Sequence, residues 1–314
     1  MDPAGFATLS RVLIVAGKGG VGKTTVTAAL ARMAADAGLT ALIVEVEGKS
    51  GLAAAFGHDD TVLDYNEVEL SPGVRARTLT PDRALVEYLQ DHGLKRLSKR
   101  LSSSGVLDVV ATAAPGIKDI LVLGKVKQLE RAGTADVIIV DAPAAGHAVT
   151  FLASAKGLID AVSVGPILTQ AEEVVALLND PARCQVILVT LPEETPVNEV
   201  VETAFALEDR VGVQLGPVVV NGLYPVLELN VDAATPPATS PAEAETLRAA
   251  AAFRLHRQAL QREQLDRLAA ALPLARLELP LLFTTELGAD EVRVLAEALA
   301  DQVKALPEPE AARA

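Results

Sequence analysis

A glycine-rich segment near the amino end constrains this chain more than any other feature. Residues 17–25 read Gly-Lys-Gly-Gly-Val-Gly-Lys-Thr-Thr, which fits the pattern G-x-x-x-x-G-K-[ST]. The apolar run at 11–16 predicts a buried strand before this segment, and the apolar periodicity of 24–36 predicts a helix after it. The sequence therefore predicts a strand, a glycine loop and a helix in immediate succession.

Each residue type in this loop has a chemical reason to be there. Glycines allow successive backbone N–H groups to turn toward phosphate oxygens, and the helix N-terminus adds a partial positive charge. Lys23 is placed to contact the β and γ phosphates, and the hydroxyl of Thr24 can ligate Mg²⁺. We therefore expect an ATP site with Mg²⁺, bound by Gly17, Lys18, Gly19, Gly20, Val21, Gly22, Lys23, Thr24 and Thr25.

A dinucleotide site is the main alternative for the same residues. Residues 17–22 also satisfy G-x-G-x-x-G, and Glu45 lies where such folds place a carboxylate for the ribose. A nicotinamide or flavin site, however, does not need Lys23 and Thr24 directly after the last glycine, whereas a triphosphate site needs both. We therefore favour the triphosphate site, and titration with ATP and NADH separates the two.

Apolar runs alternate with helical patterns along the chain of 314 residues. Half of the residues are hydrophobic and only 3% are aromatic, which is typical of a parallel sheet covered by helices. We expect an α/β fold with a doubly wound, mostly parallel sheet flanked by helices, in a single domain spanning 1–314. The expected strands are 12–16, 41–46, 137–140, 162–164, 185–190 and 217–221.

The pattern changes at two places in the chain. Residues from about 82 to 133 read as helical segments with a basic stretch, and we interpret them as a helical insertion over the sheet. Residues from about 230 to 242 are rich in proline, alanine and threonine, which predicts a flexible loop. A long helix over 242–271 and a final amphipathic helix over 292–306 are expected to follow.

Charge and cysteine content exclude some classes of protein. Lys and Arg number 28 against 41 Asp and Glu, so a net charge of -13 disfavours general attraction to nucleic acid or anionic lipid. Cys184 is the one cysteine, and its place before an apolar run predicts a small buried residue at a strand edge. No apolar stretch is long enough to span a membrane. We expect a cytoplasmic protein without direct membrane insertion or nucleic-acid binding.

Carboxylates follow two of the expected strands. Glu45 and Glu47 alternate at the end of the second strand, so both can point toward the glycine loop, and Glu47 is a candidate for orienting an attacking water. Asp141 ends another buried strand, where a carboxylate can hold Mg²⁺ together with Thr24. The residues after it, 142–147, form a second loop that can sense the γ phosphate.

Lys18 adds a second cation to a loop that already has Lys23. If two copies of the chain face each other across their nucleotides, each Lys18 can reach the phosphates of the partner, as an arginine finger does in trans. A solvent-exposed loop lysine is the alternative.

These motifs together resemble the ATPases of the ArsA, Get3, MinD and ParA group, whose deviant Walker A loop carries a signature lysine at the position of Lys18. The segment 141–147 is similar to the second switch of the ArsA/Get3 branch, which would place Gly146 at the nucleotide. The strand end at 218–221 resembles its adenine-binding strand, so that Asn221 would contact the base. Residues 45–48 and 165–170 look most like the single-loop, anion-transporting-ATPase-like proteins of actinobacteria.

The resemblance implies a Mg²⁺-dependent P-loop hydrolase with Lys18, Lys23 and Glu47 as catalytic residues. It also implies a nucleotide-sandwich homodimer, or a heterodimer with a paralogous ATPase, that acts on a protein client or membrane partner. Glu47 stands where family members commonly carry aspartate, which suggests slow hydrolysis. A single cysteine excludes arsenite binding through several thiols and a Cys-x-x-Cys zinc clasp. A ParA- or MinD-like positioning factor and a weakly hydrolysing nucleotide sensor remain as alternatives.

Overall fold

One sheet collects strands from most of the chain in the computed structural model, which describes residues 1–46, 51–91, 116–227 and 240–308. Within these ranges the sheet has eight strands in the order β3-β4-β2-β5-β1-β6-β7-β8. β3 pairs with β4 in antiparallel fashion, and the remaining pairs are parallel. The strands are β1 Val12–Gly17, β2 Ala41–Val46, β3 Val68–Ser71, β4 Val74–Leu79, β5 Val137–Ala144, β6 Cys184–Thr190, β7 Gln214–Leu223 and β8 Arg276–Pro280.

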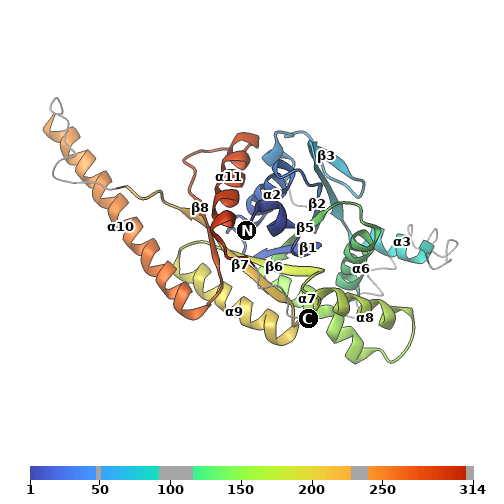
Figure 1. Ribbon diagram of the computed structural model, residues 1–314. Helices are drawn as coiled ribbons and strands as arrows, with labels where there is room; N and C mark the ends of the chain where they lie inside the picture. Colours follow the sequence, from blue (N-terminus) through green and yellow to red (C-terminus); the bar gives the residue numbers. More distant parts are fainter. Residues whose placement is uncertain (47–50, 92–115, 228–239, 309–314) are drawn as a thin grey trace.

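Helices cover both faces of this sheet (Figure 1). In the described ranges they are α1 Pro3–Ala7, α2 Lys23–Asp36, α3 Pro81–Asp91, α6 Ile117–Ala132, α7 Ala145–Ala161, α8 Pro166–Leu178, α9 Glu194–Arg210, α10 Pro241–Ala271 and α11 Ala289–Ala305, with a 3-10 turn η1 at Ala54–Phe56. Figure 1 shows α2 and α11 on one face, α7, α8 and α9 on the other, and α10 projecting from the body.

The two faces of β1 explain why its sequence is apolar without interruption. Leu13 and Val15 join a buried cluster with α2 and α11, whereas Val12 and Ile14 join a second cluster with α6, α7, α8 and α9. Successive strand residues point to opposite faces, so a strand covered on both sides needs apolar residues at every position. The predicted α/β fold with a mostly parallel, helix-flanked sheet is confirmed.

The strand expected at 162–164 is wrong. Val162 is the C-cap of α7, Gly165 has a φ of 111°, and Pro166 begins α8, so these residues form a short link between two helices. Val164 is 82% exposed, unlike a strand residue in the covered part of the sheet. The link between the two helices has four residues, 162–165, and none of them belongs to a strand.

Three strands lie outside the sequence prediction: β3, β4 and β8. β4 carries Arg75 and Arg77, and β8 carries Arg276 and Glu278, so neither reads as an apolar run. Both lie toward the sides of the sheet, where polar side chains can reach partners: Arg75 pairs with Glu67.

The helical predictions agree with the structure in three regions. α2 matches the helix expected after the glycine loop, α10 matches the expected long helix, and α11 packs its apolar residues against α2 and β8. α3 and α6 lie between β4 and β5, inside the predicted insertion, which stays a prediction because 92–115 lie outside the described residues. Of the expected flexible loop, 228–239 also lie outside them, and Pro241 and Ala242 already belong to α10.

Cys184 begins β6 and is completely buried, as the sequence predicted. Burial raises the pKa of its thiol to about 12, so the thiol stays protonated and unreactive at neutral pH. Separately, none of the described helices combines the length and the apolar character that crossing a membrane requires.

We expect the contact between α2 and α11 to contribute strongly to stability. Leu30 on α2 is 1% exposed, and Leu30→Ala should lower the free energy of unfolding by about 2 to 5 kcal/mol because it leaves a cavity. Leu247→Ala on α10 is the matched control: this leucine is 42% exposed, and its truncation should cost less than about 1 kcal/mol. Urea unfolding of both variants measures the difference, and equal losses would contradict the packing described.

Candidate functional site

The glycine loop joins the carboxyl end of β1 to the start of α2. Gly20 and Gly22 have φ values of 85° and 90°, in the left-handed region that favours glycine. A Cβ atom on Gly17 would lie 2.3 Å from the carbonyl oxygen of Val189, and one on Gly22 would lie 2.3 Å from Nδ2 of Asn221. Close approach to the backbone of β6 therefore requires glycine at position 17. Gly22 is favoured by its positive φ and leaves room for the Asn221 amide of β7.

Lys23 is the first residue of α2 and is 7% exposed. Its Nζ donates a hydrogen bond to the backbone oxygen of Lys18 at 3.0 Å, so the ammonium group lies across the glycine loop. The N-terminus of α2, which begins at Lys23, adds backbone N–H groups and a partial positive charge at the same place. Together they form a cationic, donor-rich surface that suits the phosphates of a nucleotide.

Thr24 and Asp141 meet beside this surface. The hydroxyl of Thr24 donates to Oδ2 of Asp141 at 2.7 Å, and Asp141 is completely buried. β5 lies between β1 and β2, which places Asp141 level with Val15 on one side and Glu45 on the other. A hydroxyl and a carboxylate next to a phosphate site are oxygen ligands of the kind that Mg²⁺ prefers, with phosphates and waters as its other ligands. This pair fits the implied magnesium ion.

Glu45 lies beside Asp141 in the sheet, and its side chain contacts β4. It is 1% exposed and accepts a hydrogen bond from the hydroxyl of Thr78 at 2.8 Å. The backbone N–H of Thr78 donates in turn to the oxygen of Asp64, so the segment after η1 is tied to the same place. Glu47, the residue expected to orient water, lies outside the described residues.

Asn221 lies near the end of β7 and contacts the glycine loop directly. Its Nδ2 donates to the carbonyl oxygen of Val21 at 3.0 Å, which fixes the loop from the side opposite Asp141. The strand end is itself held by α10, because Gln261 accepts from the N–H of Tyr224 at 2.9 Å and donates to the oxygen of Gly222 at 3.1 Å. The structure thus gives Asn221 a bracing contact, and its expected contact with adenine stays a prediction.

Lys18 makes an ion pair within its own chain. Its Nζ lies 2.6 Å from Oε1 of Glu199 on α9, and both side chains are more than one third exposed. A groove of about 470 Å³ opens beside this pair. Lys18, Gly19, Ala144, Gly146, Val149, Thr150, Glu199, Glu202, Thr203, Ala206 and Arg210 line it. This groove brings Gly146 next to Lys18. The second loop expected at 142–147 is wrong, because β5 continues to Ala144 and α7 begins at Ala145, so Gly146 lies in the first turn of that helix. Its expected place at the nucleotide stays a prediction.

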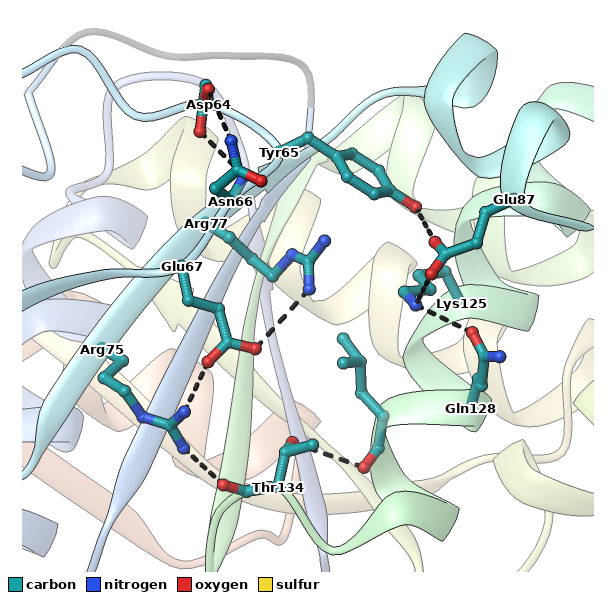
Figure 2. Close-up of polar contacts among 11 residues, drawn as sticks. Asp64, Tyr65, Asn66, Glu67, Arg75, Arg77, Glu87, Lys125, Gln128 and Thr134 are labelled. Atoms are coloured by element: carbon teal, nitrogen blue, oxygen red, sulfur yellow. Dashed lines mark hydrogen bonds and ion pairs between the residues drawn. The ribbon is translucent and has the colours of Figure 1, made fainter. Parts of the chain in front are cut away.

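A second cavity, of about 280 Å³, lies between α3, α6 and α8. Its lysines are already neutralised: Lys125 pairs with Glu87 at 2.6 Å, and Lys127 pairs with Glu173. Figure 2 shows that the Tyr65 hydroxyl also donates to Glu87 and that Lys125 reaches Gln128. Cations that are matched in this way offer little to a phosphate, so the glycine loop remains the candidate site.

The network in Figure 2 links Tyr65, in the segment before β3, to α3 and α6 through Glu87. Burial would raise the pKa of Glu87, but the hydrogen bonds from Lys125 and Tyr65 outweigh it and hold that pKa below its usual range. Burial, with the bond to Glu87, raises the pKa of Tyr65. Glu87 therefore stays charged and Tyr65 protonated at neutral pH, which keeps the contacts intact.

The sequence prediction missed Thr78 and Glu199. Each contacts a residue of the candidate site from far along the chain, at separations of 33 and 181 positions. Thr78 lies in a strand that does not read as apolar, and Glu199 is an ordinary polar residue of an amphipathic helix. No local signal distinguishes them.

The fold and the site define a P-loop nucleotide-binding protein. Comparison with known proteins agrees: residues 10–163 match the family described as "Anion-transporting ATPase". "ATPase BagA" of Mycobacterium tuberculosis is 35% identical over 229 residues, which cover 68% of this chain and 66% of that protein. A "Putative arsenical pump-driving ATPase" of Halobacterium salinarum is 30% identical, over 69% of this chain and 36% of its own length. "ATPase get3" of Schizosaccharomyces japonicus is 29% identical, over 45% of this chain and 42% of its own.

The chain belongs to the ArsA-type family of P-loop ATPases. The matched region includes the glycine loop, α2 and Asp141, which are the elements that build the candidate site.

Two glycines of the loop allow a matched test of its packing. Gly22→Ala should cost about 1 kcal/mol for the left-handed backbone and about 1 kcal/mol more for displacing the Asn221 amide from Val21. Gly20→Ala has the same backbone cost but meets nothing within 4 Å. Chemical denaturation should therefore show a larger loss for the Gly22 variant. A larger loss for the Gly20 variant would contradict the contact with Asn221.

Proposed function

We propose that this protein is a Mg²⁺-dependent ATPase of the ArsA/Get3 branch. The observation that carries the proposal is the hydrogen bond of 2.7 Å between Thr24 and buried Asp141, beside a glycine loop at a helix N-terminus. A magnesium ion with its phosphates needs this combination of an oxygen pair and a donor-rich loop.

The residues of the site would have the following roles. Lys23 and the N–H groups of the loop bind the β and γ phosphates, and Thr24 and Asp141 hold the metal ion, which neutralises phosphate charge when bound. Glu47 orients the attacking water, Asn221 contacts adenine, and Gly146 senses the γ phosphate from the start of α7. A glutamate at position 47 favours slow turnover, since catalysis depends on where the carboxylate places the water.

We further propose that two subunits sandwich their nucleotides, either as a homodimer or with a paralogous ATPase. Lys18 would then stabilise the phosphate charge of the partner subunit during hydrolysis, in trans. Opening and closing of this dimer in the cytoplasm would act on a protein client or membrane partner. The chain's net charge of -13 supports a client other than nucleic acid.

Substitution of the two lysines of the loop should affect ATP binding and ATP turnover differently. Lys23→Ala removes the cation that lies across the loop and should abolish ATP binding, whereas Lys18→Ala should bind ATP and lose turnover. Lys304→Ala, on the exposed side of α11, is the control and should change neither property. Calorimetric titration with ATP and release of phosphate measure the two effects. Equal ATP turnover by the Lys18 variant and the unchanged protein would disprove the role in trans.

Removal of the metal ion tests Asp141. In the unchanged protein, phosphate release should stop when Mg²⁺ is chelated. Asp141→Asn should lose most of the stimulation by Mg²⁺, because one of two protein ligands no longer carries charge. Asp301→Asn, an exposed carboxylate on α11, is the matched control. An unchanged dependence on Mg²⁺ in the Asp141 variant would rule out this metal site.

A further inference from the structure

The side chain of Lys18, in the glycine loop, is held by a residue of its own chain. Its Nζ contacts Oε1 of Glu199 at 2.6 Å, with exposed side-chain fractions of 39% and 36%. The contact joins two elements that are 181 positions apart in the sequence. Such a pair is specific to the fold and is not a consequence of local sequence.

The two ends of this ion pair differ in how firmly they are fixed. Glu199 lies on α9, where Val197, Val200 and Leu207 are buried against the sheet. Lys18 lies in the glycine loop and has a long side chain with four rotatable bonds. Glu199 is therefore the fixed partner, and the lysine side chain is the one that can change position.

In this position the ammonium group of Lys18 is paired with Glu199 of its own chain at 2.6 Å. The proposed action in trans requires the same ammonium group to bind the triphosphate of a facing subunit, so Glu199 and that triphosphate compete for it. Exposed ion pairs are weak, and they bias an equilibrium by up to about fivefold, so a triphosphate can compete with this one.

We infer that Glu199 is a positioning residue that restrains Lys18 in the nucleotide-free protein and so limits the basal rate of ATP hydrolysis. The inference rests on the proposed ATPase function. When two subunits close on ATP, the phosphates outcompete Glu199 and Lys18 leaves the groove beside α9. Glu199 acts only through the lysine and does not touch the reacting atoms.

Glu199→Gln tests this restraint, because it removes the charge and keeps the size of the side chain. Glu202→Gln is the matched control. Glu202 lies one turn along α9 and lines the same groove, but the hydrogen bond of Lys18 goes to Glu199. We expect the Glu199 variant to hydrolyse ATP about two to five times faster than the unchanged protein at low salt, and the Glu202 variant to remain unchanged. The difference should shrink near 1 M salt, where ion pairs are screened.

Affinity for ATP separates restraint of Lys18 from simple repulsion between Glu199 and the triphosphate. Restraint predicts a higher kcat for the Glu199 variant with an unchanged Kd for ATP. Repulsion predicts tighter ATP binding in both variants. Tighter binding without faster turnover, or equal turnover in all three proteins, would overturn the inference.

A second measurement does not depend on hydrolysis. The rate at which an amine-reactive acylating reagent modifies Lys18 in the nucleotide-free protein, followed by mass spectrometry, should rise in the Glu199 variant and not in the Glu202 variant. Equal rates would show that Glu199 does not hold the lysine and would overturn the inference. Failure of the unchanged protein to hydrolyse ATP would instead contradict the proposed function, and the labelling rates would still report on the ion pair.

Discussion

The hydrogen bond between Thr24 and Asp141 depends on the order of strands more than on either residue alone. β5 lies next to β1 in the sheet, so the carboxylate of Asp141 is level with Val15 and reaches the first turn of α2. A parallel sheet covered on both faces excludes water from this point, and a buried carboxylate there needs a partner. The contact between Asp141 and Thr24 thus depends on the strand order of the sheet and on the position of α2.

Much of the sheet could be predicted from sequence because its central strands are buried on both faces. Five of the strands contain a continuous apolar run, which is typical of a strand covered on both faces and is easily recognised in a sequence. These strands are β1, β2, β5, β6 and β7. β4 and β8 escaped prediction because arginine and glutamate interrupt them, and in β4 these side chains form ion pairs at the side of the sheet. The short apolar stretch at 162–164 was misread because periodicity does not distinguish a strand from a link between helices.

The residues of the candidate site likewise include some that the sequence predicts and some that it does not. The loop from Gly17 to Thr25 is a local motif, and Asp141 directly follows an apolar run that is itself recognisable, so both were predicted from sequence, although β5 continues beyond Asp141 to Ala144. Glu199 and Thr78 were not, because their importance comes from which element packs beside which, and one amphipathic helix gives no indication of the loop it will face. Long-range polar partners of this kind are visible only after the chain has been folded.

The contact between Gln261 and the end of β7 connects α10 to the glycine loop. Gln261 is 5% exposed and hydrogen-bonds to the backbone on both sides of Leu223. Leu223 lies two residues beyond Asn221, which donates a hydrogen bond to Val21. α10 has 31 residues, and Figure 1 shows that it projects from the body of the molecule. Gln261, the end of β7 and Asn221 form a continuous set of contacts from this helix to the glycine loop, so a displacement of α10 would reach the loop through them.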